Sequence, residues 1–548
     1  MSEVVLDGEH LTPKDVERVA REGATVVVAD SARERVRASR ERVEDVMAAD
    51  EAVYGVNTGF GDLVTERIPR EDLTALQHNL LRSHASGAGE TLDREAVRAL
   101  LVTRVNALLA GHSGIREVVV DHLVTMLNER VHPVVRSRGS LGASGDLAPL
   151  AHAALVLIGE GAATVDGDPE RTGPTAPAGA TDVGERLPGD EALARAGLDP
   201  LELAPKEGLA LINGTQLTVG LAALAVRDAE RLVRTADVAG SLTTEVTMGT
   251  TASSDPSIHD ARPHDGQRRS ARAVRTVTAD SEIVESHRNC DRVQDAYSIR
   301  CLPQVHGAVR DAVAHLREAV ETELNSATDN PLVFDASEVD DRASGTGRAA
   351  VLSGGNFHGA PLAHRLDYLL GALTDLATVC ERRTDRLLNP QLQEDHLPPY
   401  LAADSGLESG YMIAQYTAAA LVNECRSLGR SATDNTPVSG GQEDHVSMSA
   451  GAALHVRRAL AATATVVGAE LVCGTVALRS VDDDLSPGVG TAAAVSALRE
   501  AVPELAAEPP TGAGGDRPLD DDLELAGLLA VEGALLDRVD AAVDGDIP

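Results

Sequence analysis

The tripeptide Ala143-Ser144-Gly145 could generate chemistry that no ordinary side chain supplies. Attack of the Gly145 amide nitrogen on the Ala143 carbonyl carbon, with loss of water, would close a five-membered ring. Loss of a second water from Ser144 would then leave an electrophilic methylidene-imidazolone. Gly142 and Gly145 tolerate backbone angles that a Cβ forbids, so the chain can turn tightly enough for this closure. Taken alone, however, an Ala-Ser-Gly tripeptide is more typical of a simple turn.

Two other catalytic interpretations of this region are weaker. A serine hydrolase would place Ser144 in a Gly-x-Ser-x-Gly motif, but Asp146 occupies the position of the last glycine. A lyase of the fumarase and aspartase type would carry a Gly-Ser-Ser-x-Met-Pro string, which this sequence lacks. From the tripeptide alone, a simple turn and ring formation both stay open.

The string around the tripeptide, GSLGASGDLAPL at 139–150, resembles the ring-forming segment of the aromatic amino acid ammonia-lyase family. Further similar blocks follow the family's order along most of the chain. They are YGVNTGFG (54–61), RSHASGAGE (82–90), EGLALINGT (207–215), VQDAYSIRCLPQV (293–305), SATDNPLVF (326–334), SGGNFHG (353–359) and GQEDHVSM (441–448). The resemblance implies that Ala143, Ser144 and Gly145 form 4-methylidene-imidazol-5-one (MIO) autocatalytically, and that no metal or external cofactor is needed.

The resemblance also implies a carbon–nitrogen lyase that removes an α-amino group together with a β-hydrogen. The amine leaves poorly and the β-hydrogen is scarcely acidic, so an electrophile and a base must act together. Tyr54 matches the family's base, although a phenol can act only if its surroundings lower its pKa. Glu443 is counted with Tyr54 and the ring-forming tripeptide among the predicted catalytic residues.

Six further residues are predicted to bind the substrate. Arg300 would bind its carboxylate with Tyr297 and Gln294, three and six residues earlier, on the same helical face or turn. Asn213 lies in an uncharged segment, where its amide either satisfies backbone groups or contacts the ring and substrate. Phe357 is predicted to line the site, because the chain has only three phenylalanines and all lie in the matched blocks. The sixth residue, His84, bears on the choice of substrate.

His84 and Glu443 suggest which amino acid is used. Histidine-specific members of the family combine a Ser-His-Ala string with Gln-Glu-Asp-His-Val-Ser-Met, and both strings occur here. A carboxylate and an imidazole can hydrogen-bond a polar substrate ring, and such a site rejects analogues that lack the ring nitrogens. The expected reaction is L-histidine to trans-urocanate and ammonia, the first step of histidine degradation. The alternatives are a phenylalanine or tyrosine ammonia-lyase, an MIO-dependent aminomutase and, outside catalysis, an acidic regulatory or scaffold relative.

The sequence departs from the family's pattern at three positions. Ala296 and Gly441 stand where proline and asparagine are expected, and His306 replaces an apolar residue. None of the three is a predicted catalytic group, but Ala296 puts the exact placement of Tyr297 in doubt.

Charge restricts the partners. The 548 residues include 85 acidic and 49 basic ones, for a formal net charge of −36, which repels nucleic acid and anionic membranes. We therefore expect a small amino acid as partner, with no nucleic acid and no membrane. The resemblance implies a homotetramer of dihedral symmetry, whose active sites combine residues of several subunits.

The same charge suggests a high-salt habitat. Lysine occurs only at Lys14 and Lys206, and strong acidity suits a protein kept soluble at high salt, where screening weakens self-repulsion. A GC-rich genome would also favour arginine, but it does not explain the acidic excess. We therefore predict a halophilic protein.

The five cysteines and the N-terminus suggest a cytoplasmic protein. Cys290, Cys301, Cys380, Cys425 and Cys473 are odd in number and form no Cys-x-x-Cys pair, so we expect reduced, mostly packed thiols. The N-terminal residues lack the basic start and apolar run of a secretory signal.

Helix patterns dominate the sequence, so the expected fold is mainly α. Long amphipathic segments at 92–130, 216–249, 303–326, 358–388, 406–430 and 445–480 predict a long-helix bundle. Residues 1–215 would form a smaller N-terminal α+β region with the Tyr54 and MIO loops, and 216–548 the helical core and C-terminal helices. The resemblance implies the ammonia-lyase fold with its L-aspartase-like helical core.

Local signals refine this expectation at four places. Capping patterns predict helix starts at Thr12 and Ser31. Residues 25–28 predict a buried strand, and residues 164–168 a short hairpin.

Overall fold

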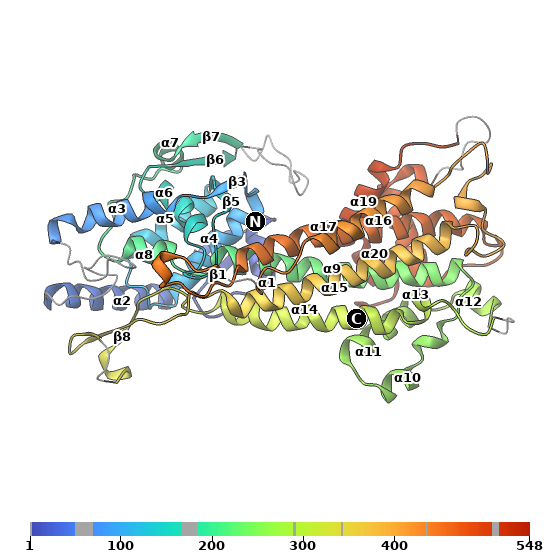
Figure 1. The fold of residues 1–548 in the computed structure, drawn as a ribbon, viewed down its shortest axis with the longest axis horizontal. Coiled ribbons are helices and arrows are strands. Elements are labelled where there is room, and N and C mark those ends of the chain that lie inside the picture. The colour runs from blue at the N-terminus through green and yellow to red at the C-terminus, as the bar shows by residue number, and fades with distance from the viewer. Residues whose placement is uncertain are drawn as a thin grey trace. The chain divides into compact units, whose positions relative to one another are not determined.

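The computed structural model is mainly helical, as the sequence predicts, with helices, 3-10 turns included, over 62% of the residues that it describes (Figure 1). It describes residues 3–49, 69–166, 184–288, 292–340, 344–433, 436–506 and 515–548. These residues form two units, each built from three chain segments. The first unit comprises Met1–Leu224, Leu316–Asp367 and Arg430–Leu454, and the second comprises Ala225–His315, Tyr368–Gly429 and His455–Pro548.

The first unit combines helices with small sheets. Its complete α-helices are α1 (Pro13–Ala20), α2 (Asp30–Ala49), α3 (Leu73–His84), α4 (Arg94–Leu109), α5 (Glu117–Asn128), α6 (Leu147–Leu157), α7 (Gly189–Arg195) and α8 (Glu207–Ile212). Residues 96–109 of α4 are all buried, which makes this helix a central core element. Helix α4 contacts α1, α2 and α5.

Four small sheets lie among the described residues of this unit. A parallel pair joins β1 (Glu3–Leu6) to β2 (Thr25–Val28), and an antiparallel pair joins β3 (Ala88–Thr91) to β5 (Arg136–Arg138). The other two are antiparallel, in the strand orders β4-β6-β7 and β8-β10-β9. Their strands are β4 (Val131–Pro133), β6 (Ala162–Asp166), β7 (Gly184–Pro188), β8 (Leu332–Asp335), β9 (Ser344–Gly345) and β10 (Ala349–Leu352).

Long helices supply most of the second unit. Helices α9 (Gln216–Val246), α14 (Leu302–Leu324), α15 (Ala360–Leu388) and α17 (Ser449–Ala477) have residues in both units. The rest are α10 (Pro256–Ala261), α11 (Asp265–Val277), α12 (Glu282–Ser286), α13 (Tyr297–Arg300), α16 (Met412–Ser427), α18 (Val489–Ala501), α19 (Asp520–Glu532) and α20 (Ala534–Ala542). The long segments predicted from 216 onward are thereby confirmed, whereas the segment 92–130 divides into α4 and α5.

Of the two predicted helix starts, the structure confirms one and contradicts the other. Thr12 caps α1, because its hydroxyl accepts from the Asp15 amide while the Asp15 side chain returns a bond to the Thr12 backbone. The start predicted at Ser31 is wrong, since α2 begins at Asp30 and Ser31 lies within its first turn. Asp30 itself supplies the acid that favours a helix N-terminus.

The strand at 25–28 is confirmed, but it is only partly buried: Val26 is enclosed, whereas Val27 is exposed. The short hairpin predicted at 164–168 is wrong in its pairing, and its residues Gly167 and Asp168 lie outside the described residues. Strand β6 ends at Asp166, and its antiparallel partner β7 begins only at Gly184, while β4 pairs along the other edge of β6.

One helix within the described residues, Ser449–Ser480, is long and apolar enough to cross a membrane by length and composition. Of its most apolar window, 89% is buried inside the protein, as in the core helix of a soluble protein. The described cysteines are free thiols, three buried and Cys301 partly so, as the sequence predicts. Cys290 lies outside the described residues.

Candidate active site

The loop that carries the tripeptide predicted to form a ring, residues 139–146, connects β5 to α6 and is tightly enclosed. We call it the ring-forming loop. Gly142 and Gly145 have φ values of 66° and 75°, in the left-handed region that favours glycine. A Cβ on Gly142 would lie 2.2 Å from Ser447 Oγ, and one on Gly145 would lie 2.2 Å from the Gly214 carbonyl oxygen. Both glycines are therefore required by the surrounding structure as well as by backbone geometry.

Ser144 lies between two of the predicted site residues. Its hydroxyl donates to Glu443 Oε1 at 2.8 Å, and its carbonyl oxygen accepts from Asn213 Nδ2 at 2.8 Å. Ala143 and Asn213 are buried, while Ser144 and Glu443 are partly accessible. The structure thus brings together the tripeptide, Asn213 and Glu443, all within the first unit.

Asn213 has the features expected of a group that holds a modified loop. Its side-chain oxygen is buried and makes no hydrogen bond to the residues that the structure describes. Its backbone carbonyl accepts from Arg104 Nη1 at 2.9 Å, and Arg104 also donates to Gln216 Oε1 at 2.6 Å. Burial lowers the pKa of Arg104 to about 10, which leaves the guanidinium charged at neutral pH.

The enclosed loop and the Asn213 contact fit an MIO group. Cyclisation consumes the Ala143 carbonyl and retains that of Ser144, so Asn213 Nδ2 already donates to the carbonyl that the ring would keep. The small residues flanking Ser144 leave room for the chain to close on itself. Ala143, Ser144, Gly145 and Asn213 are the residues that would form and hold the group.

Asp146 is a buried carboxylate that sequence analysis did not assign to the site. Its side chain accepts from Ser140 Oγ at 2.7 Å, from the Thr218 amide at 2.8 Å and from Thr218 Oγ1 at 3.1 Å. Burial raises its pKa, and these hydrogen bonds only partly offset the effect. Asp146 therefore ties the end of the ring-forming loop to the start of α9. Its position directly after the tripeptide is the one signal that could have drawn attention to it.

A second set of hydrogen bonds connects the ring-forming loop to the segments that contain Glu443 and Phe357. Ser447 Oγ donates to the Gly142 carbonyl oxygen at 2.8 Å, and the Gly359 amide donates to the same oxygen at 3.0 Å. Phe357, which is half-buried, precedes this contact by two residues. His358, which lies between Phe357 and Gly359 in the chain, stacks on His445 with ring centroids 5.7 Å apart. The blocks around Phe357 and Glu443 therefore adjoin each other and the ring-forming loop.

His84 is the last residue of α3 and is half-buried. Its Nδ1 lies 2.9 Å from the Leu80 carbonyl oxygen and 3.0 Å from Ser83 Oγ. These local contacts fix the ring through Nδ1, so the substrate-facing role predicted for His84 would fall to Nε2.

The three predicted carboxylate-binding residues belong to the second unit. Arg300 Nη1 donates to Gln294 Oε1 at 2.5 Å, and both side chains are exposed, as is Tyr297 at 73%. The expectation of one helical face is only partly correct. Tyr297 and Arg300 are the first and last residues of α13, whereas Gln294 lies in the non-helical segment before it.

Tyr54 lies outside the described residues, as does its neighbour Phe60. Within the described ranges, the structure gathers no group of three His, Cys, Asp or Glu side chains able to hold a metal ion.

Comparisons with known proteins agree with this fold and loop. Residues 11–500 match the family described as aromatic amino acid lyase, and the chain belongs to that family. It is 62% identical over 544 residues to the "Probable histidine ammonia-lyase" of Halobacterium salinarum, covering 99% of each chain. The crystal structure of histidine ammonia-lyase from Trypanosoma cruzi matches with a TM-score of 0.85 and 35% identity, over 98% of this chain and 95% of that one. Tyrosine aminomutase from Streptomyces globisporus matches with a TM-score of 0.87 and 34% identity over 100% of both chains.

Proposed function

We propose that this protein is a histidine ammonia-lyase, a carbon–nitrogen lyase that converts L-histidine to trans-urocanate and ammonia in histidine catabolism. The full-length similarity to histidine ammonia-lyases supports this assignment. The structural observation that best supports it is the hydrogen bond between Ser144 Oγ and Glu443 Oε1, whose atoms lie 2.8 Å apart. This contact places a carboxylate beside the carbon that the ring would present to a substrate, where it can accept a hydrogen bond from an imidazole N–H.

The predicted site residues would have different roles in the reaction. Ala143, Ser144 and Gly145 would hold the MIO group, which would supply an electrophile for the substrate amine. Asn213 holds the Ser144 carbonyl and draws electron density from it through the Nδ2 hydrogen bond. Glu443 orients the substrate imidazole, and His84 contributes a second polar partner for the same ring. Phe357 lines the apolar side of the site.

The α-carboxylate of the substrate would be bound by Arg300, with Gln294 and Tyr297 beside it. A guanidinium presents a planar set of donors that matches a carboxylate, and the hydrogen bond to Gln294 restrains its orientation. Tyr54, as phenolate, would remove the β-proton. This chain would act in the cytoplasm as a homotetramer, and the exposure of the Arg300 group in a single chain is compatible with active sites completed by other subunits.

An MIO-dependent aminomutase is the closest alternative, because the matched solved structures include a tyrosine aminomutase over the full chain. Such an enzyme would return ammonia to the β-carbon. The test is to incubate the purified protein separately with L-histidine, L-phenylalanine and L-tyrosine and to identify the products. Urocanate from histidine supports the proposal, whereas a β-amino acid, or a faster reaction with phenylalanine or tyrosine, contradicts it.

A further inference from the structure

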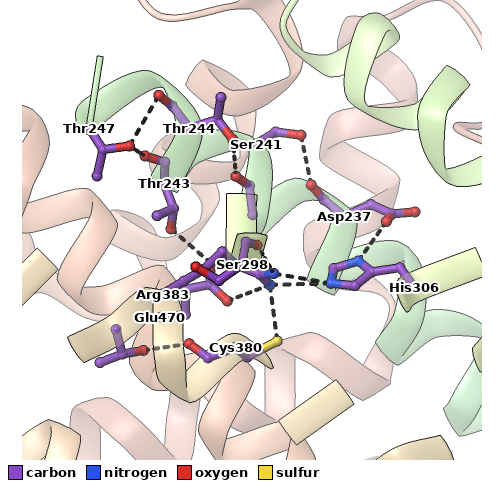
Figure 2. A network of polar contacts seen from close by, with 12 residues as sticks. Asp237, Ser241, Thr243, Thr244, Thr247, Ser298, His306, Cys380, Arg383 and Glu470 are labelled. Carbon is purple, nitrogen blue, oxygen red and sulfur yellow. Dashed lines mark hydrogen bonds and ion pairs between the residues drawn. The ribbon is translucent and has the colours of Figure 1, made fainter. Parts of the chain in front are cut away.

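Four helices of the second unit enclose a cluster of charged side chains (Figure 2). Asp237 comes from α9, His306 and Arg310 from α14, Arg383 from α15 and Glu470 from α17. Asp237, His306, Arg383 and Glu470 are completely buried, and Arg310 is 5% exposed. Burying charge is costly unless every charge is paired and hydrogen-bonded. The cluster meets this condition, with two carboxylates facing two guanidinium groups.

Arg383 is the centre of the cluster. Its Nε donates to Glu470 Oε1 at 2.5 Å, and its Nη2 donates to Glu470 Oε2 at 2.9 Å. Both of its Nη atoms lie 3.3 Å from His306 Nε2, and Thr243 Oγ1 donates to Glu470 Oε1 at 2.8 Å. Figure 2 shows the guanidinium directed between Glu470 and His306.

His306, where the sequence departs from the family's apolar residue, orients this guanidinium. Burial lowers the pKa of His306, and the Arg383 cation lowers it further, so the imidazole is neutral. Its Nδ1 donates to Asp237 Oδ1 at 2.7 Å, which leaves Nε2 as the acceptor for Arg383. Asp237 is held in turn by Arg310 Nη2 at 2.5 Å. Glu470 and His306, which face Arg383 from other helices, are therefore each held by a residue of α9.

Arg383 makes two further bonds, one of which leaves the cluster. Its Nη2 donates to Cys380 Sγ, on the same helix, at 3.1 Å. Its Nη1 donates to the Ser298 carbonyl oxygen at 3.1 Å. Ser298 lies in α13, whose single turn carries Tyr297 and Arg300 at its two ends.

A helix of four residues has no stability of its own. The capping Cys301 amide serves the Tyr297 and Ile299 carbonyls, whereas the Ser298 carbonyl accepts from Arg383. The position of α13 must therefore come from tertiary contacts, of which Arg383 supplies a charged one and Ile299 a buried apolar one.

We infer that Arg383 is a positioning residue, which sets the orientation of Arg300 toward the substrate carboxylate by anchoring the Ser298 carbonyl. This inference rests on the proposed function, in which Arg300 binds that carboxylate. A merely stabilising role would not need this geometry, because buried ion pairs can often be replaced by apolar side chains without loss of stability. The planar guanidinium serves Glu470, His306 and Ser298 at the same time, which the three donors of a lysine on a flexible stem cannot reproduce.

The test is a double-mutant cycle on the full-length enzyme, with KM and kcat for L-histidine as readouts. We expect Arg383→Lys to raise KM by about tenfold while kcat changes by less than about threefold, as for lost ground-state binding. Arg300→Ala should raise KM at least as much. In the Arg300→Ala background, Arg383→Lys should then have no further effect on KM, because both changes remove the same interaction.

Arg234→Lys is the matched control. Arg234 donates to both oxygens of Asp540, at 2.8 and 3.0 Å, and to the Ile547 backbone carbonyl at 3.1 Å, so it resembles Arg383 but anchors the C-terminal segment instead of α13. It should leave KM unchanged whatever it does to thermal stability. If Arg383→Lys does not fold, Glu470→Gln replaces it in the cycle, since that change releases Arg383 with little change of volume.

Three results would overturn the inference. An equal rise in KM from Arg383→Lys with and without Arg300 would show that it does not act through Arg300, while leaving the carboxylate-binding role intact. An unchanged KM in Arg383→Lys, or in Glu470→Gln when that variant is used, would show that no positioning is lost. An unchanged KM in Arg300→Ala would instead remove the carboxylate-binding role itself, and with it the basis of the inference.

Discussion

Ser144 Oγ lies 2.8 Å from Glu443 Oε1, although 299 positions separate the two residues in the chain. Asn213 Nδ2 reaches the carbonyl of the same serine from a third segment. One residue is therefore held through its side chain and its backbone by two groups that can also contact a substrate. This arrangement supports several predictions about the loop and its chemistry.

Ser144→Ala should abolish most turnover without unfolding the protein. Alanine has no hydroxyl to lose, so the second dehydration cannot occur and no electrophile forms. Intact-mass measurement should find the parent lighter than its sequence mass by two water molecules, and the variant should lack at least the second of these losses. The fold should tolerate the change, because alanine is smaller than serine. The Asn213 hydrogen bond to the backbone carbonyl of residue 144 does not depend on the side chain. A fully active variant, or a fully active parent of full sequence mass, would contradict ring formation.

Glu443→Gln should weaken the preference for histidine. A hydrogen bond to a charged group contributes about 1.5–3 kcal/mol, so kcat/KM for L-histidine should fall roughly 10- to 100-fold. Activity on L-phenylalanine, which has no ring nitrogen to bind, should change much less. The intact mass of the variant must still show both dehydrations, since otherwise the loss would reflect an immature loop. Equal losses on both substrates would argue against a role in recognising the imidazole.

Tyr54→Phe should lower kcat by about 100-fold or more while changing KM little, because it removes a base and retains the aromatic ring. Tyr416→Phe is a suitable control, since Tyr416 is 59% exposed in α16. A variant as fast as the parent would mean that another group removes the β-proton.

The secondary structure was largely predictable because periodicity is a local property. Small and apolar residues recur at helical spacing through 216–246 and 449–477, and the structure forms α9 and α17 there. The hairpin at 164–168 failed because a turn motif does not reveal which distant strand completes a sheet. Strand β6 pairs with β4 and with β7, which begins only at Gly184.

The members of the candidate site were predictable only through the resemblance of the sequence blocks. Nothing in local periodicity connects Ser144 with Asn213 or Glu443, since only folding brings those segments together. Arg104 was missed because a single charged residue in an amphipathic pattern suggests a solvated surface, and Asp146 because its position after the tripeptide indicates only that a serine-hydrolase motif is absent. In the structure Arg104 is buried and donates to the Asn213 carbonyl, and Asp146 is buried against Thr218. Burial of charge is a property of the packed structure and leaves no signature in spacing.

Added salt should raise the thermal stability of this protein. With a formal net charge of −36, self-repulsion opposes the folded state, and counterions screen it. The similarity to a relative from the halophile Halobacterium salinarum is consistent with such adaptation. Between low and molar KCl, we expect the Tm to rise by about 5 °C or more, measured by scanning calorimetry. A fall in Tm over this range would reject the prediction.

Stability should also decrease on acidification, partly through His132. This imidazole is enclosed in β4, with Nε2 3.4 Å from Asp166 Oδ1. Burial lowers its pKa from 6.5 to about 4, helped by the nearby Arg98 and Arg94 cations and opposed by Asp166. Between these two values the unfolded chain binds a proton that the folded protein excludes. Above pH 6.5, His132 therefore costs the folded protein no stability. As the pH falls toward 4, the free energy of unfolding decreases because of this residue by at most about 3 kcal/mol.

His132→Gln should therefore flatten the dependence of the free energy of unfolding on pH within that window, as measured by urea titration at several pH values and constant high salt. Other histidines whose pKa burial lowers, such as His259 and His306, remain in both proteins, so the difference between the two curves isolates His132. His264→Gln is the control, because the His264 side chain is exposed before α11 and its removal disturbs no buried group. Identical slopes for the parent and His132→Gln would mean that His132 is protonated as readily in the folded protein as in the unfolded chain.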